Sequence, residues 1–226
     1  MSQSFTLTDS QSLSDLVVFL SRSRRVLDGS ARLIAADGVL AVYTAILYPR
    51  GLLDTSPTVL GLRTFALTEA VELDKVVPVR SLIERLKRLE STAHDATVPV
   101  TVTVPLEVNT VTWAGISPPK GGWEPNGQTS AARLEEAARQ GIDEVAATIP
   151  QGTGEMIVER VRAEVWGRTV GGLEFVPAGA GFAAFSLGFL SDDEPVRLYE
   201  SGLWARLSTS RGHVLVRRKP WTLQAK

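Results

Sequence analysis

The chain has 226 residues, of which 44% are hydrophobic and 22% charged, and its net charge is −1. A chain of this length buries roughly 70% of its unfolded surface, so it can form a core without covalent or metal cross-links. The absence of cysteine excludes disulfides, zinc–thiolate and iron–sulfur sites and cysteine nucleophiles. A signal-peptide pattern and an apolar run of membrane-spanning length are both missing, so we expect a cytoplasmic protein.

The first half of the chain predicts helices alternating with strands. Apolar residues at helical spacing predict helices over residues 13–25 and 79–89. Strands are predicted over residues 31–36, 39–47, 59–67 and 98–104. Asp37-Gly38, which tolerates positive φ angles, is the strongest hairpin-turn signal in the chain.

The second half opens with a break in all periodicity. Prolines and glycines in residues 114–127 predict an irregular loop there. Helices follow over residues 134–149 and 155–166, and a closing hairpin over residues 203–209 and 213–219. Residues 179–190 fit a short packed helix or a buried strand, and the helix is preferred. We therefore expect a single α+β domain over residues 1–226, with a largely antiparallel sheet of hairpins, about four or five helices and a seam at residues 114–127.

Catalytic motifs are missing from the sequence. Nucleophile-elbow, zinc-protease, phosphate-loop and dinucleotide-binding patterns do not occur, and His94 is typical of a solvated loop histidine. Glu155 and Glu159 share a helix face and could bracket a hard metal ion or serve a carboxylate-dependent enzyme, but a cation between them, such as Arg162, is the simpler explanation. We expect no metal and no cofactor, and a non-enzymatic protein.

The least ordinary stretch of the sequence lies between residues 112 and 125. Two indole rings, rigid prolines and permissive glycines favour a binding surface, and the predicted binding residues are Trp113, Pro118, Pro119, Lys120, Gly121, Gly122 and Trp123. In the alternative interpretation, Trp113 ends a strand in the core and Trp123 only holds the loop on the body of the protein. The expected partner is another protein or a second copy of this chain.

A basic end on a mildly acidic body provides the runner-up hypothesis. Residues 201–226 carry six cations and no carboxylate, which leaves −7 on the rest of the chain. The cations predicted to bind nucleic acid are Arg206, Arg211, Arg217, Arg218 and Lys219. Alternation divides these cations between two faces, and charge on an edge strand also guards against aggregation.

Two segments resemble an uncharacterised protein family of high-GC Gram-positive bacteria. They are TWAGISPPKGGWEP at residues 112–125 and ARLSTSRGHVLVRR at residues 205–218. The resemblance implies a bacterial cytoplasmic setting and no catalytic role, and it assigns no functional residue.

Overall fold

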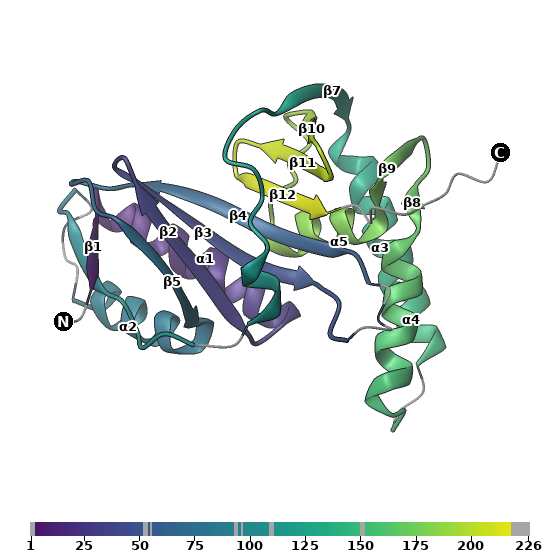
Figure 1. Ribbon diagram of the computed structural model, residues 1–226, viewed down its shortest axis with the longest axis horizontal. Helices are drawn as coiled ribbons and strands as arrows, with labels where there is room; N and C mark the ends of the chain where they lie inside the picture. The colour runs from purple at the N-terminus through teal and green to yellow at the C-terminus, as the bar shows by residue number, and fades with distance from the viewer. Residues whose placement is uncertain are drawn as a thin grey trace. The chain divides into compact units, whose positions relative to one another are not determined.

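A computed structural model of the protein describes residues 3–51, 54, 56–92, 95, 97–108, 111–149 and 152–217 (Figure 1). The chain divides into two compact units, residues 1–45 with 62–115 and residues 46–61 with 116–226. Within the described residues, five α-helices accompany an antiparallel sheet of eight strands in the order β5-β2-β3-β4-β12-β11-β10-β7. The α+β class and the largely antiparallel sheet are therefore as predicted.

The first unit is an antiparallel sheet with two helices packed side by side. Its helices are α1 (Ser10–Val26) and α2 (Val79–Glu90), and their apolar stripes are buried. Its strands are β1 (Ser4–Leu7), β2 (Ser30–Ala36), β5 (Leu73–Pro78), β6 (Val100–Thr103) and the larger parts of β3 (Val39–Leu47) and β4 (Thr58–Ala66). Asp37 and Gly38 join β2 to β3 with φ angles of 51° and 75°, which confirms the predicted hairpin.

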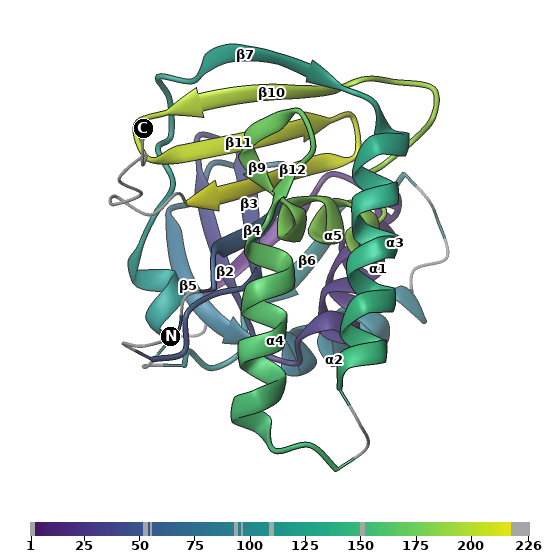
Figure 2. The same cartoon turned by 90° about the vertical axis from the view of Figure 1, so that its right-hand side faces the viewer.

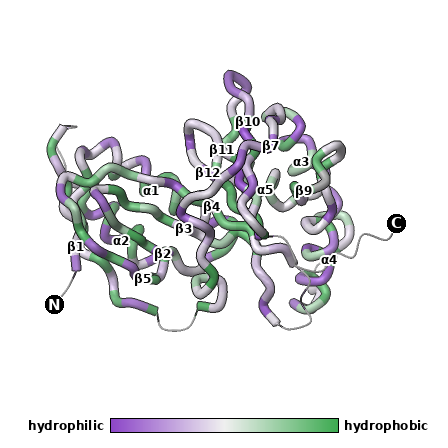
Figure 3. The backbone as a smooth tube through the Cα atoms, turned by 45° about the horizontal axis from the view of Figure 1, so that its top comes forward, coloured by the Kyte–Doolittle hydropathy of each residue, from purple (hydrophilic) through white to green (hydrophobic). Residues whose placement is uncertain are grey.

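The second unit packs helices against a four-stranded antiparallel layer. Its strands are β7 (Glu124–Thr129), β10 (Val196–Ser201), β11 (Trp204–Thr209) and β12 (Gly212–Arg217), with β8 (Thr169–Val170) and β9 (Leu173–Pro177) as a separate pair. Helix α5 (Ala178–Leu187) contacts β12, α3 (Ala131–Thr148) and α4 (Glu155–Gly167), as Figure 2 shows. In Figure 3, α3 and α4 carry both purple and green segments, as amphipathic helices do.

One prediction about the second unit was wrong. Residues 114–127 are not wholly irregular, because β7 begins at Glu124 and pairs with β10. Strand β7 lies at the end of the strand order, where Pro125 can dispense with a backbone N–H, and the pairing register shifts opposite Arg197 and Tyr199. An edge position and a bulge thus accommodate proline and glycine in β7, although these residue types predict a loop.

The helices and the closing hairpin predicted for the second half are present. Residues 178–187 form the helix predicted near that position, and β11 and β12 form the predicted closing hairpin. In the part of the chain that the structure describes, no helix is both long and apolar enough to cross a membrane.

Candidate functional site

The first predicted indole lies in the core of the first unit. Trp113 sits in a short 3-10 turn, Thr112–Gly115, and is only 4% exposed. The turn is held by Arg32, which donates to the carbonyl oxygen of Ala114 at 2.7 Å and pairs with Asp74. Trp113 is therefore buried in the core, as the alternative interpretation expected, although it lies in a 3-10 turn and not at the end of a strand.

The second indole lies at the edge of the sheet in the second unit. Its Nε1 donates to the carbonyl oxygen of Pro119 at 3.2 Å, which closes the segment from Pro119 to Trp123 into a compact turn. Lys120, Gly121 and Gly122 are exposed within that turn, and Pro118 is half-buried. Trp123 itself is half-buried, so part of its ring is open to solvent.

Trp123 contacts Arg206, which also contacts the ring of Tyr199. The guanidinium carbon of Arg206 lies 4.6 Å from the centre of the Trp123 ring and 4.5 Å from the centre of the Tyr199 ring. Arg206 on β11 is the register partner of Tyr199 on β10, and Tyr199 in turn pairs with Pro125 on β7. The loop hypothesis and the basic-hairpin hypothesis thus converge on one aromatic–cation cluster, Trp123, Tyr199 and Arg206.

Arg206 is held without a counter-charge from the described residues. It makes neither an ion pair nor a hydrogen bond within that part of the chain, and its Nε is buried without a partner. Burial lowers the pKa of Arg206, and the nearby Tyr199 opposes that effect. The cluster therefore holds an incompletely solvated positive charge, which an incoming anion would stabilise.

The same sheet face holds a half-buried titratable group, His213. Arg206 and Ser208 lie two residues apart on β11, and Ser208 is the register partner of His213, whose Nδ1 lies 2.9 Å from the Ser208 hydroxyl. Burial lowers the pKa of His213, and the positive charge of Arg206 lowers it further. Both effects favour the neutral imidazole of His213 over its protonated form.

The remaining cations of the basic hairpin do not form one patch. Arg211 is exposed at the turn and donates to the carbonyl oxygen of Leu190 at 3.3 Å. Arg217 is half-buried and opposes Trp204 in the register. Arg218 and Lys219 lie outside the described residues.

The carboxylates considered for metal binding face a cation. Arg50 lies 3.9 Å from the Glu155 carboxylate and 3.4 Å from that of Glu159, so the paired cation is Arg50 rather than Arg162. Burial lowers the pKa of Arg162, and the negative charge of Glu159 opposes that effect. Among the residues that the structure describes, no group of three or more histidines and carboxylates could hold a metal ion, and His94 lies outside those residues.

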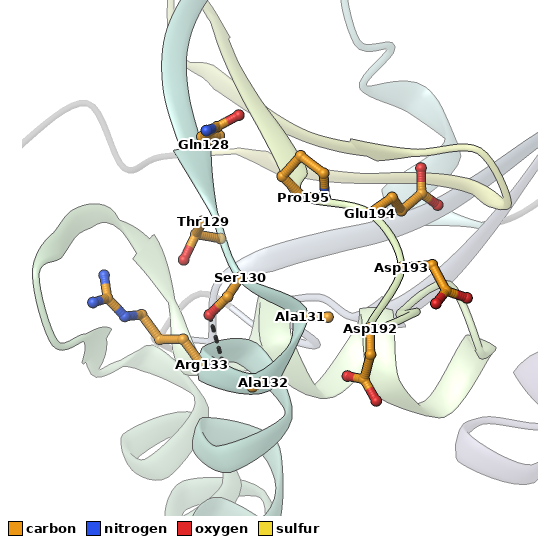
Figure 4. Close-up of a pocket in the computed structure, with 10 residues that line it drawn as sticks. All are labelled: Gln128, Thr129, Ser130, Ala131, Ala132, Arg133, Asp192, Asp193, Glu194 and Pro195. Atoms are coloured by element: carbon orange, nitrogen blue, oxygen red, sulfur yellow. Dashed lines mark hydrogen bonds between the residues drawn. The ribbon is translucent and has the colours of Figure 1, made fainter.

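A pocket of about 560 Å³ lies elsewhere in the second unit, between the start of α3 and the turn before β10 (Figure 4). Its charged lining residues are Arg133, Asp192, Asp193 and Glu194. Glu194 is held by the Ser210 hydroxyl at 2.6 Å and the Ser210 N–H, and these bonds lower its pKa. The pocket lining offers carboxylates and one guanidinium but no nucleophile next to a base.

Sequence reasoning missed Tyr199 because it missed β10. The signal was present in the sequence, since the apolar Val196 and Leu198 alternate with the charged Arg197. Pro195 and the acidic residues before it predict a turn, and this turn pattern masks the start of the strand that follows.

The fold is similar to that of bacterial DNA polymerase sliding clamps. A solved structure titled "Caulobacter crescentus pol III beta" matches 95% of this chain with 12% identity and a TM-score of 0.52. The DNA polymerase III subunit beta from Pseudomonas aeruginosa matches 96% with 14% identity and a TM-score of 0.52. A Caulobacter crescentus DNA polymerase sliding clamp matches 99% with 14% identity and a TM-score of 0.53.

This chain covers between 64% and 67% of the length of those structures, and the likeness is one of fold. Residues 1–107 match a family model described as a domain of unknown function, DUF8010. Residues 118–221 match a second one, the domain of unknown function DUF8185. No curated protein shows significant similarity to the sequence.

Proposed function

We propose that this chain is a non-enzymatic accessory protein that binds a protein partner through the surface around Trp123. The observation that carries the proposal is the half-exposed indole, fixed by its bond to Pro119 and by the contact with Arg206. Binding hot spots are enriched in tryptophan, tyrosine and arginine, the three residue types of this cluster. A ring already held in place loses little conformational entropy when a partner binds.

The fold gives this proposal its setting. One of the matched structures is named as a subunit of DNA polymerase III, so the fold is used there by a component of a larger assembly. We extend only that class of role, an accessory to another protein, to this chain. The cysteine-free composition and the resemblance to a high-GC Gram-positive family favour a bacterial cytoplasm as its location.

The proposal is tested by capturing partners with purified, tagged protein in which Trp123→Ala is compared with the wild type. Truncating a hot-spot aromatic side chain should weaken the binding of a specific partner by about tenfold or more. Leu106→Ala is the matched control, because Leu106 is also a large apolar side chain and is 88% exposed in the first unit. A partner set that is the same for wild type, Trp123→Ala and Leu106→Ala would overturn the proposal.

A second candidate function is nucleic-acid binding, favoured by cations on the helices of the first unit. Arg25 on α1 and Lys87 and Arg88 on α2 are exposed, and none is within ion-pair distance of a carboxylate in the described part of the chain. A protein of similar fold is named as a sliding clamp of DNA polymerase, which adds to this candidate. The hypothesis based on the C-terminal hairpin is weaker, because Arg211 lies at the turn of the hairpin and donates to the carbonyl oxygen of Leu190.

Salt dependence separates these versions of nucleic-acid binding. Affinity for a duplex should fall as salt rises, and replacing Lys87 and Arg88 by glutamine should reduce the slope by about one for each phosphate that the protein no longer neutralises. Replacing Arg211 and Arg217 instead should reduce it only if the hairpin binds. Absence of binding at low salt would remove this candidate.

A further inference from the structure

We propose that Arg206 recognises a carboxylate, so that the protein partner docks with an aspartate or glutamate of an acidic segment against the Trp123–Tyr199–Arg206 cluster. This inference rests on the proposed function, and it names the chemistry of the partner. It follows from the aromatic rings that surround the guanidinium and from the lack of a carboxylate beside it in the described chain.

Arg206 differs in its contacts from the ion-paired arginines of the second unit. Some arginines of the second unit pair with carboxylates, as Arg139 does with Glu135 and Arg168 with Glu144. Arg206 has two aromatic rings instead and makes no ion pair in the described chain. A guanidinium carries five donors in a planar fork that matches a carboxylate with two parallel hydrogen bonds.

The planar guanidinium of Arg206 is already oriented before a ligand binds. The rings of Trp123 and Tyr199, both within 4.6 Å of the guanidinium carbon, limit the orientations available to the side chain. An arginine positioned before binding loses less rotamer entropy when the carboxylate arrives. Its incomplete solvation also strengthens the attraction, since less water has to be removed.

Further cations lie on the same face of the sheet as Arg206. Ser208 and Trp204 flank Arg206 at two-residue spacing on β11, and their register partners on the neighbouring strands are Arg197 and Arg217. Register partners in an antiparallel pair point to the same side, so Arg197, Arg206 and Arg217 form a diagonal across β10, β11 and β12. Neither flanking arginine has an ion pair within the described residues. A segment with two or three carboxylates would be matched by this diagonal.

An acidic peptide fits this surface better than a nucleic acid. Single strands bind by stacking bases on aromatic rings, whereas both rings here are already in contact with Arg206.

The test uses the full-length protein and a fluorescein-labelled hexaglutamate peptide, with binding followed by fluorescence anisotropy. We expect measurable binding by the wild type, a loss of about tenfold or more in Arg206→Gln, and an intermediate loss in Arg206→Lys, which keeps the charge but not the planar fork. Arg160→Gln is the matched control, because Arg160 is exposed on α4 of the same unit and the change in charge is equal. Equal affinity in Arg206→Gln and Arg160→Gln would overturn the inference.

Two further arms make the outcome decisive. Tighter binding of a labelled six-nucleotide single strand, abolished in the same Arg206 variants, would also overturn the choice of an acidic peptide. Thermal unfolding of each variant identifies any that fail to fold, and Arg206→Lys then carries the comparison. If a partner is captured in a Trp123-dependent way but hexaglutamate neither binds nor competes, the proposed function stands and this inference fails.

Discussion

Three basic side chains of the second unit, Arg162, Arg206 and His213, are half-buried. Burial is the largest cause of the lowered pKa of Arg162, Arg206 and His213. Arg162 is partly compensated by Glu159, whereas His213 lies beside the Ser208 hydroxyl and near the guanidinium of Arg206. Positive charge around β11 and β12 is therefore costly in the folded state, and binding an anion there would offset part of that cost.

The pH dependence of stability follows from His213. Because the pKa of His213 in the folded protein lies below its ordinary value of 6.5, the unfolded chain takes up a proton first as the pH falls. This residue's share of stability is complete above about pH 6.5 and is lost progressively below it, down to the folded-state pKa. The expected slope is less than about 1.4 kcal/mol per pH unit.

Urea unfolding of the wild type and of His213→Gln between pH 7.5 and 5 checks this prediction. We expect the variant to lose less stability over the acid half of the range. The carboxylates titrate alike in both proteins, so the difference between the two curves isolates His213. Parallel curves would show that the imidazole is not desolvated in the folded protein.

At the scale of elements, the close approach of α3 and α5 organises the second unit. Helix α5 is rich in glycine and alanine, and a Cβ on Gly181 would lie 2.8 Å from the carbonyl oxygen of Leu134 on α3. Backbone cannot move aside as a flexible side chain can. The small residues of α5 are therefore explained by packing.

Gly181→Ala should destabilise the protein by about 1–3 kcal/mol, despite the better helix propensity of alanine, because the added methyl overpacks the interface. Gly167→Ala is the control, since Gly167 ends α4 and no atom lies within 4 Å of the added carbon. That control should be neutral or stabilising by up to about 1 kcal/mol. Denaturant midpoints measure both changes, and an equal effect of the two substitutions would contradict the packing account.

The elements that the sequence predicts are those with strong local signals. The Asp37-Gly38 hairpin, α2 and the β11–β12 hairpin follow from turn chemistry and periodicity. Strand β5 escapes prediction because its burial pattern does not alternate cleanly, and β7 because it contains Pro125 and Gly127. Their strand character depends on pairing with β2 and β10, which no local pattern encodes.

The candidate site, like the fold, could be predicted from the sequence only in part. Composition alone points to both Trp123 and Arg206, although in separate hypotheses. Their contact depends on the register of β7, β10 and β11, as does the presence of Tyr199. Composition thus identifies interesting residues, whereas long-range strand pairing decides which of them meet.

At the scale of the whole molecule, the two family matches and the two structural units do not have the same boundaries. The matches cover residues 1–107 and 118–221, whereas the second unit also includes residues 46–61. Leu47, Val59 and Leu60 in that segment are buried, and a Cβ on Gly179 would lie 2.6 Å from Leu47. The second unit therefore needs chain from the first half to complete its core.

A fragment of residues 116–226 should consequently fail to fold cooperatively by itself. Circular dichroism melts of this fragment should lack the sharp transition of the full chain. As a control, a protease site inserted after the exposed Gly115 leaves residues 46–61 present, so the cleaved full chain should keep its transition. A sharp, two-state melt of the isolated fragment would show instead that residues 46–61 are dispensable. The expectation of a single domain over residues 1–226 stays a prediction, which coincident fluorescence and circular dichroism transitions of the full chain would support.

The most direct test of the central claim, that a protein docks around Trp123, is site-specific photo-cross-linking in living cells. A photoreactive residue in place of the exposed Lys120 is compared with one in place of the exposed Arg160. We predict a discrete cross-linked partner from position 120 that is absent from position 160 and disappears when Trp123→Ala is added. Cross-links that are identical at both positions, or that survive the loss of the indole, would contradict the claim.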